Sequence, residues 1–212
     1  MQSAARIVGA QAGVAAIGAA YFFWTRQSDD QYVSRNKEPS VQQVITAAAS
    51  IIKANRSYGF VCTSKSAQAP ECRVMDLKRL SDETFDFGLV SRTFTRKAST
   101  LKSNGGLCTI AFHDTRASGE AGYPVLSGTA REVPLARLDE REKLWKSSWS
   151  FFHPGPAAAD VVQWHFVPTR LEIVSNLTGI TDEWQPVTAE RAAERGAAAP
   201  WVLLPRRSAG GT

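Results

Sequence analysis

The 212-residue sequence predicts a mainly β (α+β) domain, with six strands in a closed or partly closed barrel, short peripheral helices and one N-terminal transmembrane helix. The strand-like segments follow one another too closely for the helical crossovers that a parallel α/β sheet requires. Short helix-forming stretches are interspersed among them, and a long apolar run precedes the domain. These three observations define the expected fold class.

Local patterns justify each element of the domain. Ser40 is a typical helix N-cap residue, and apolar residues recur after it at helical spacing. The run Asn104-Gly105-Gly106 is typical of a helix end, and Pro168 predicts a bend in the last strand. The predicted helices are 40–52, 95–103 and 138–148; the predicted strands are 58–64, 72–78, 85–90, 107–113, 125–133 and 161–174, the first two forming a hairpin.

Composition limits the classes of partner. A 43% share of hydrophobic residues and a 21% share of charged residues are ordinary for one folded domain with a core. The net charge of +5 suits an anionic ligand or an anionic lipid surface, but it is too small and too scattered to predict nucleic-acid binding. Three unclustered histidines and the absence of a CxxC pair argue against a metal site. Cys62, Cys72 and Cys108 are interpreted as reduced core residues, with a Cys62–Cys72 bridge across the hairpin as the open alternative.

The N-terminal run, residues 7–24, contains only Gln11 as a polar residue and is long enough as a helix to span roughly 27 Å, about a bilayer core. Four aromatic residues, 21–24, stand at one end, where an aromatic belt lies in membrane proteins. Gly9 and Gly13 form a GxxxG pair that allows another helix to approach closely. A retained single-pass anchor is favoured over a cleaved signal or transit peptide and over a buried core helix.

The predicted organisation has four parts: a transmembrane anchor at 1–26, a polar linker at 27–39, the domain at 40–185 and an extended C-terminal tail at 186–212. The last fifteen residues are expected to be disordered on their own. Trp201 and the apolar residues after it suit an anchor for a partner protein. The tail and the Gly9/Gly13 helix face are therefore the expected contacts with other membrane-protein subunits.

Four stretches, CRVMDLK, FDFGLVSRTFTRKASTLKSN, LCTIAFHD and VLSGTAREV, resemble in order and spacing the pyridoxamine 5'-phosphate oxidase-like, FMN-binding split-barrel superfamily. The resemblance covers about residues 41–176. It implies a split β-barrel that binds FMN at the interface of a homodimer formed through the barrel. By position it assigns the flavin contacts to Arg73, Val74, Met75, Lys78, Val90, Ser91, Arg96, Lys97 and Tyr123.

The chemistry of these residues supports phosphate binding independently of the resemblance. Arginine offers a fork of donors that matches two phosphate oxygens. Arg96 and Lys97 stand at a predicted helix N-terminus, where free N–H groups favour anions, and no acidic residue occurs between Asp86 and Asp114. The alternative interpretation of the same run is a solvated basic helix face.

The sequence also departs from the family pattern. It lacks the C-terminal Arg-Leu-His run of true pyridoxamine phosphate oxidases, so that reaction is not expected. Val90 and Ser91 replace a frequent Tyr-Thr pair, which removes a flavin hydrogen bond. Some members of the superfamily bind heme through a histidine, which keeps a heme role for His153 or His165 as a minor alternative.

Two functions follow as hypotheses. The first is a membrane-anchored FMN-binding protein acting as a flavin-dependent oxidoreductase, with no catalytic acid or base that the sequence identifies. The second is a non-catalytic accessory subunit of a large membrane complex that has kept the barrel without its cofactor. The Arg-bearing, acid-free N-terminus favours a single-pass protein of the mitochondrial inner membrane, in a respiratory complex in the second case.

Overall fold

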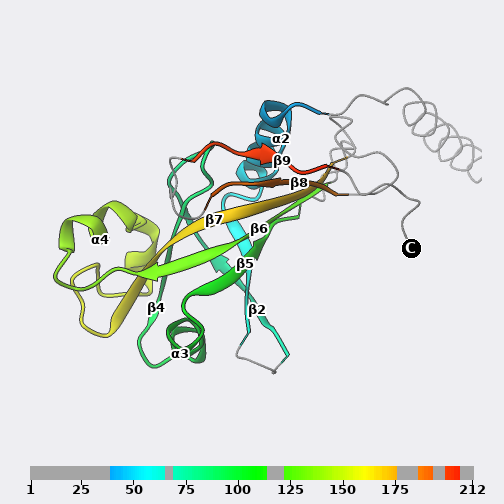
Figure 1. The fold of residues 1–212 in the computed structure, drawn as a ribbon. Helices are drawn as coiled ribbons and strands as arrows, with labels where there is room; N and C mark the ends of the chain where they lie inside the picture. The colour runs from blue at the N-terminus through cyan, green and yellow to red at the C-terminus, as the bar shows by residue number, and fades with distance from the viewer. Residues whose placement is uncertain (1–38, 65–68, 114–121, 176–185, 193–198, 206–212) are drawn as a thin grey trace, which may run out of the picture. The chain divides into compact units, whose positions relative to one another are not determined.

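The computed structural model describes residues 39–64, 69–113, 122–175, 186–192 and 199–205. Within these ranges, no helix is long and apolar enough to cross a membrane. The predicted transmembrane helix at 7–24 lies outside the described residues, as does the predicted linker except for Pro39. The helices are α2 (Val41–Ala54), α3 (Arg96–Ser103) and α4 (Leu138–Leu144), followed by the 3₁₀ turn η1 (Ser147–Phe151) (Figure 1). The strands are β1 (Tyr58–Thr63), β2 (Glu71–Asp76), β3 (Lys78–Arg79), β4 (Phe87–Arg92), β5 (Leu107–Ala111), β6 (Gly122–Glu132), β7 (Val161–Ser175), β8 (Val187–Glu190) and β9 (Val202–Leu203).

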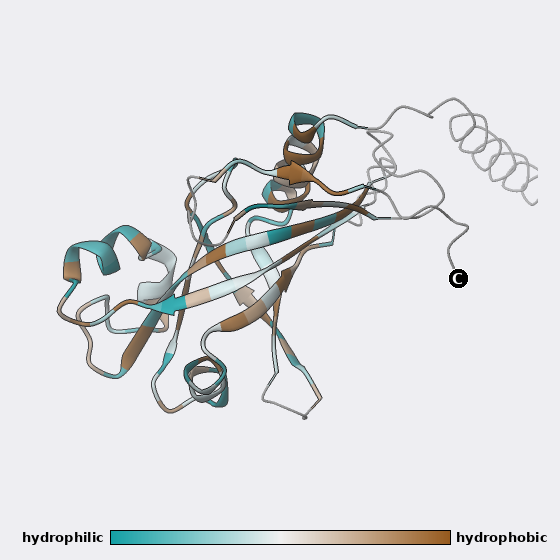
Figure 2. Ribbon diagram, in the orientation of Figure 1, coloured by the Kyte–Doolittle hydropathy of each residue, from teal (hydrophilic) through white to brown (hydrophobic). Residues whose placement is uncertain are grey.

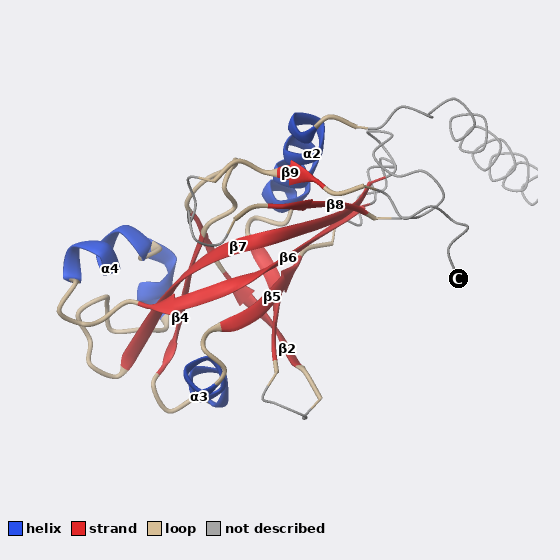
Figure 3. Ribbon diagram, viewed as in Figure 1, coloured by secondary structure: helices blue, strands red, loops and turns tan. Residues whose placement is uncertain are grey.

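The strands form one antiparallel sheet in the order β2-β1-β5-β6-β7-β4-β3, with β8 pairing β7 and β9 pairing β8 (Figure 3). Strands β2 and β3 stand at opposite ends of this order, yet only the buried Leu77 separates them in the chain. The sheet must therefore curl until its two ends meet at Leu77. No ladder joins β2 to β3 in the described residues, so the barrel stays open, as expected of a split barrel.

Helix α2 forms because its sequence caps it and gives it one apolar face. The Ser40 side chain accepts from the backbone N–H of Gln43, and the Gln43 side chain accepts from the backbone N–H of Ser40, so two free donors are satisfied. Figure 2 shows hydrophobic and hydrophilic residues sharing α2, whereas α3 is largely hydrophilic. The helix packs on β6 and β7 over the core that includes Phe87, Phe112 and Trp164.

The expected bend at Pro168 takes the form of a β-bulge. Strand β7 continues through Pro168, but the pairing shifts from Ser127–Arg170 to Gly128–Pro168, so Thr169 has no paired residue in the β6 register, although its hydroxyl donates to the Ser127 carbonyl oxygen at 3.5 Å. A Cβ atom on Gly128 would lie 2.3 Å from the Val167 carbonyl oxygen, so only glycine fits opposite the bulge. The bulge accommodates a proline that has no N–H to donate to the ladder.

The prediction of six strands is wrong: the described residues form nine. The segment predicted as one strand at 72–78 is interrupted at Leu77, because there the chain passes from one edge of the sheet to the other. Part of the predicted tail at 186–212 extends the sheet as β8 and β9. Trp201 is buried, and its indole N–H donates to the Glu83 carbonyl oxygen at 2.9 Å. The helix predicted at 138–148 ends at Leu144 and is followed by η1.

The prediction that all three cysteines are reduced is also wrong. Cys62 and Cys72 form a disulfide, and the two residues stand directly opposite each other in the β1–β2 hairpin. The open alternative is therefore the correct one. Cys108 is free and buried, and burial raises the pKa of its thiol to about 12.

The turn between α3 and β5 supports a prediction with a matched control. Gly105 and Gly106 both have positive φ, and the Gly106 N–H donates to the Leu101 carbonyl oxygen at 2.8 Å, as in a Schellman motif. A Cβ atom at Gly106 would lie 2.2 Å from the Ala130 carbonyl oxygen, whereas one at Gly105 would meet nothing within 4 Å. Gly105→Ala should therefore cost about 1 kcal/mol of unfolding free energy, from backbone strain alone, and Gly106→Ala about 3 kcal/mol, as urea denaturation would measure. Equal losses in the two variants would contradict this account.

Candidate functional site: a cationic pocket at the start of α3

A pocket of about 390 Å³ opens where the N-terminus of α3 meets β2 and the end of β4. Strand β2 provides Arg73, strand β4 provides Ser91, and the turn before the helix provides Phe94 and Thr95. The lining residues are Arg73, Ser91, Phe94, Thr95, Arg96 and Lys97. Three different elements thus bring three cations and two hydroxyl groups to one hollow.

The helix start exposes donors toward the pocket. Thr95 is the N-cap of α3, and its hydroxyl oxygen accepts from the Ala98 N–H at 3.3 Å. The first N–H groups of a helix have no intrahelical acceptor, so those of Arg96 and Lys97 remain available. The Ser91 and Thr95 hydroxyl groups lie 2.7 Å apart and form a hydrogen bond. Backbone and hydroxyl donors at a helix N-terminus are a common arrangement for binding an oxyanion.

Positive charge in the pocket exceeds the negative charge available to it. Arg73 and Arg96 both pair with Glu71, each at 3.2 Å. Lys97 has no carboxylate partner among the described residues; its Nζ lies 3.1 Å from the Met75 sulfur. Burial, together with the nearby Arg73 charge, lowers the pKa of Lys97 to about 8. Three cations and one carboxylate leave two uncompensated positive charges, which an anion carrying about two negative charges would balance.

The structure brings together five of the nine residues that the resemblance assigned. Arg73, Ser91, Arg96 and Lys97 line the pocket, and Met75 contacts Lys97 from β2. The other four lie elsewhere. The Lys78 ammonium donates to the carbonyl oxygens of Lys143 and Trp145, Val90 packs with Trp149 and Val161, and Val74 and Tyr123 are exposed.

Sequence reasoning missed Glu71, Phe94 and Thr95 as members of this site. Thr95 could have been found, because a threonine directly before Arg-Lys is a good N-cap candidate. Glu71 and Phe94 carry no such signal: their role depends on β2 lying beside α3, which only the fold determines.

The outer face of the sheet carries several exposed apolar side chains. The register aligns Val74 with Phe60, Phe60 with Ala111, and Ala111 with Val125. Tyr123 lies two residues before Val125 in β6 and so on the same face. Phe60 is 48% exposed, Val74 61% and Tyr123 42%, which makes this face unusually apolar for an exposed sheet surface.

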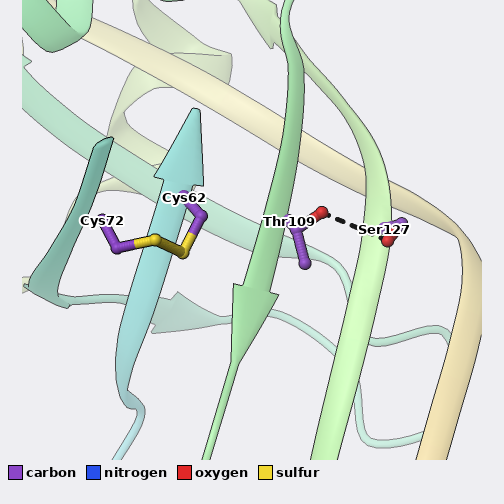
Figure 4. Close-up of a disulfide and its surroundings, with 4 residues drawn as sticks. All are labelled: Cys62, Cys72, Thr109 and Ser127. Atoms are coloured by element: carbon purple, nitrogen blue, oxygen red, sulfur yellow. Dashed lines mark hydrogen bonds between the residues drawn. A yellow bond between two sulfur atoms is a disulfide. The ribbon is translucent and has the colours of Figure 1, made fainter. Parts of the chain in front are cut away.

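The next row of residues on this face borders a second hollow of about 870 Å³. Figure 4 shows the disulfide beside the hydrogen bond between the Thr109 and Ser127 hydroxyl groups, which are 3.2 Å apart. Arg170 follows in the row and is already paired with Glu172 and Glu190 at 2.5 Å and 2.7 Å. The described side chains of this hollow thus leave less unbalanced charge than those of the α3 pocket.

The histidines offer no metal site. His165 uses its Nε2 atom in a hydrogen bond to Asp86 at 3.2 Å. His153 has a buried Nδ1 atom without a partner, and burial together with Arg92 and Lys97 lowers its pKa, so the ring is neutral at pH 7. The described parts of the chain contain no group of three or more His, Cys, Asp or Glu side chains that could hold a metal ion.

The chain thus combines an open, curled antiparallel sheet with a pocket lined by three cations at a helix start. No protein-family model and no curated protein matches the sequence. Solved structures do match its fold. A protein from Clostridium acetobutylicum related to general stress protein 26, of the pyridoxinephosphate oxidase family, is 16% identical with a TM-score of 0.56, over 71% of this chain and 96% of that chain.

Two further solved structures differ in the ligand that their descriptions name. A pyridoxamine 5'-phosphate oxidase-related, FMN-binding protein from Nostoc punctiforme is 12% identical with a TM-score of 0.50, over 78% of this chain and 95% of that chain. A heme-binding protein from Mycobacterium smegmatis is 16% identical with a TM-score of 0.55, over 77% of this chain and 62% of that chain. The chain therefore has the split-barrel fold of the pyridoxamine 5'-phosphate oxidase-like flavin-binding proteins, which confirms the fold that the resemblance implied.

Proposed function

We propose that this protein binds FMN and holds the flavin phosphate in the pocket at the start of α3. The observation that carries the proposal is the pair of uncompensated positive charges among Arg73, Arg96, Lys97 and Glu71. A phosphate monoester carries about two negative charges and accepts from N–H and O–H donors, and the pocket offers both kinds. A bound flavin would supply redox chemistry, which makes a flavin-dependent oxidoreductase the favoured activity.

The chain's own residues would bind and orient this cofactor. Arg73, Arg96 and Lys97 would fix the phosphate, with the Ser91 hydroxyl as a further donor. Phe94 is 81% exposed and lines the pocket, so it offers a planar apolar surface at the pocket edge. No described residue is assigned as a catalytic acid or base.

We further propose that a second copy of the chain covers the outer face of the sheet. This supports flavin binding because Val74 and Tyr123 lie exposed on that face, where a neighbouring chain would complete the surroundings of the flavin. The apolar side chains of Tyr58 and Phe60 on the same face favour burial over exposure. In such a dimer, Val74 and Tyr123 would lie at the interface, outside the residues that line the α3 pocket.

The N-terminal sequence supports a place at a membrane. We propose that residues 7–24 anchor the protein as a single pass, with the mitochondrial inner membrane as the favoured location. The Gly9/Gly13 face would contact helices of other membrane subunits.

A second candidate function is a non-catalytic accessory subunit of a large membrane complex, such as a respiratory complex. The observation favouring it is that Lys78 and Val90 are occupied by contacts within the protomer. The α3 pocket would then be the remnant of a former flavin site, and the contacts to the flavin ring would be lost.

The visible spectrum separates these candidates. We expect the full-length protein, purified from its native membrane in mild detergent, to show a stoichiometric flavin band and to release FMN on denaturation. Arg96→Ala/Lys97→Ala should remove the band. The control Lys102→Ala changes a half-exposed lysine on the same helix, paired with Glu132, and should keep it. A colourless protein that comigrates with other subunits would contradict flavin binding and support the accessory role, and a heme spectrum would contradict both.

A further inference from the structure

We propose that the Cys62–Cys72 disulfide is a redox switch that sets the affinity of the α3 pocket for its phosphorylated ligand. The inference rests on the proposed function, because it concerns regulation of the same site. Its basis is that the disulfide holds the strand that contributes Arg73 to the pocket and places Glu71 and Met75 against other pocket residues.

That wall is β2. Glu71 holds Arg73 and Arg96, Arg73 lines the pocket, and Met75 contacts the Lys97 ammonium. Glu71, Arg73 and Met75 occupy every second position of the strand, so their side chains lie on one face, which is directed toward α3. Cys72 and Val74 point to the opposite face. Cys72 therefore stands between Glu71 and Arg73 in the strand, while the disulfide does not line the pocket itself.

Apart from the disulfide, the strand is held by its antiparallel ladder with β1 and by a few side-chain contacts. Strand β2 is an edge strand whose ladder partner is β1, and residues 71–76 include one buried side chain, Met75. At its far end the Asp76 carboxylate pairs with Lys146, and Ser148 donates to it at 3.3 Å. Near the hairpin tip, where Glu71 and Arg73 stand, the disulfide adds a covalent link to the ladder with β1. Breaking it frees the edge strand to fray from that end.

The Cys62–Cys72 disulfide is accessible to an external thiol, whereas the nearby Cys108 thiol is unreactive. Cys72 is exposed, and Cys62 borders the 870 Å³ hollow on the outer face. Cys108 borders the same hollow, but burial raises its pKa to about 12, so it stays protonated and does not exchange with the disulfide near neutral pH. Switching therefore requires an external dithiol. One thiolate of the dithiol attacks one cysteine sulfur, which forms a mixed disulfide, breaks the Cys62–Cys72 bond and releases the other cysteine as a thiolate. The second thiol of the dithiol then attacks the dithiol sulfur of the mixed disulfide and releases the first cysteine. Two electrons and two protons pass to Cys62 and Cys72, and the dithiol becomes a disulfide.

The test compares FMN affinity in the oxidised and reduced forms of the full-length protein, measured by quenching of flavin fluorescence. We expect dithiothreitol to release two new thiol groups and to weaken FMN binding on the order of tenfold, as losing about one charge-assisted hydrogen bond would. Reoxidation should restore the affinity. Cys62→Ser/Cys72→Ser should bind like the reduced protein and no longer respond to dithiothreitol, whereas Cys108→Ser should respond like the wild type.

Hydrogen exchange provides a second measurement that does not depend on the ligand. On reduction, the backbone amides of 71–76 should exchange faster while those of α2 stay unchanged. Equal FMN affinity and equal exchange in both redox forms would overturn the switch while leaving flavin binding intact. If the oxidised protein binds no FMN, the proposed function fails. Faster exchange of the amides of 71–76 on reduction would still support the inference that the disulfide holds β2 in place.

Discussion

Replacing Lys97 with methionine is expected to weaken FMN binding by about 10- to 100-fold, the range for losing a hydrogen bond from a charged donor. The same change should stabilise the ligand-free protein. Methionine resembles lysine in length but carries no charge, so it removes the cost of a partly buried ammonium beside Arg73. Fluorescence titration with FMN and thermal unfolding without FMN measure the two effects on one variant.

The pH dependence of stability tests whether the charge of Lys97 causes this stabilisation. Lys97 has a folded pKa of about 8, below the ordinary value of 10.5, so between these values the unfolded chain binds more protons than the folded chain. Wild-type stability should therefore rise with pH across this window relative to Lys97→Met. The stabilising effect of the substitution should be complete below pH 8 and disappear above about pH 10.5. The control Lys102→Met should show neither effect, since that side chain is half exposed. A Lys97→Met variant that binds FMN normally would contradict the pocket assignment.

Replacing Arg191 with methionine is expected to cost about 3–5 kcal/mol of unfolding free energy, because it leaves the buried Asp86 carboxylate without its main cation. Arg191 donates to Asp86 at 3.0 Å and to the Pro168 carbonyl oxygen at 2.6 Å, and its guanidinium lies 4.8 Å from the Trp201 ring centre. The change thus also loosens the contact between the C-terminal segment and the barrel. Urea denaturation of the full-length protein measures the loss.

Lowering the pH should reduce the difference in unfolding free energy between the wild type and Arg191→Met. Burial alone would raise the pKa of Asp86, but the hydrogen bonds from His165 and Arg191 outweigh it and hold the pKa below its usual 3.8. The wild type therefore has this stabilisation above about pH 3.8 and loses it as the pH falls further. In Arg191→Met the pKa of Asp86 should rise, so the carboxyl becomes protonated at a higher pH than in the wild type. The cost of burying an unpaired carboxylate should therefore shrink between pH 7 and about pH 4. The control Arg170→Met removes a partly exposed ion pair and should cost no more than about 1 kcal/mol. A loss for Arg191→Met as small as that would contradict the role given to Arg191.

The central strands and helices could be predicted because their signals are local. Ser40 and Gln43 mark the start of α2, and Asn104 with two glycines marks the end of α3, within a few residues of sequence. Strands β8 and β9 could not be predicted, because four and two residues carry no usable periodicity. Strand β8 pairs with β7 and β9 pairs with β8, so both depend on the rest of the sheet being in place. Reduced cysteines were predicted and the disulfide was only the open alternative, because sequence spacing does not fix the register of a hairpin.

The place of Arg96 and Lys97 in the pocket was predictable for the same reason, because the two residues are adjacent in sequence and begin a helix. The remaining assigned contacts depended on how strands curl and on which side chains neighbouring elements occupy. Lys78 illustrates this limit, because it bonds to carbonyl oxygens of Lys143 and Trp145, more than sixty residues away.

The pairing of β4 with β7 also affects the order in which the molecule can assemble. The β1–β2 hairpin joins neighbouring segments, so it can form early and with a small loss of chain entropy. Ser91, however, pairs with Val162, about seventy residues further along the chain. The β4 side of the pocket is therefore fixed only after most of the domain has been synthesised and has collapsed. Capture of a phosphorylated ligand during refolding would thus mark one of the last steps, slower than hairpin formation.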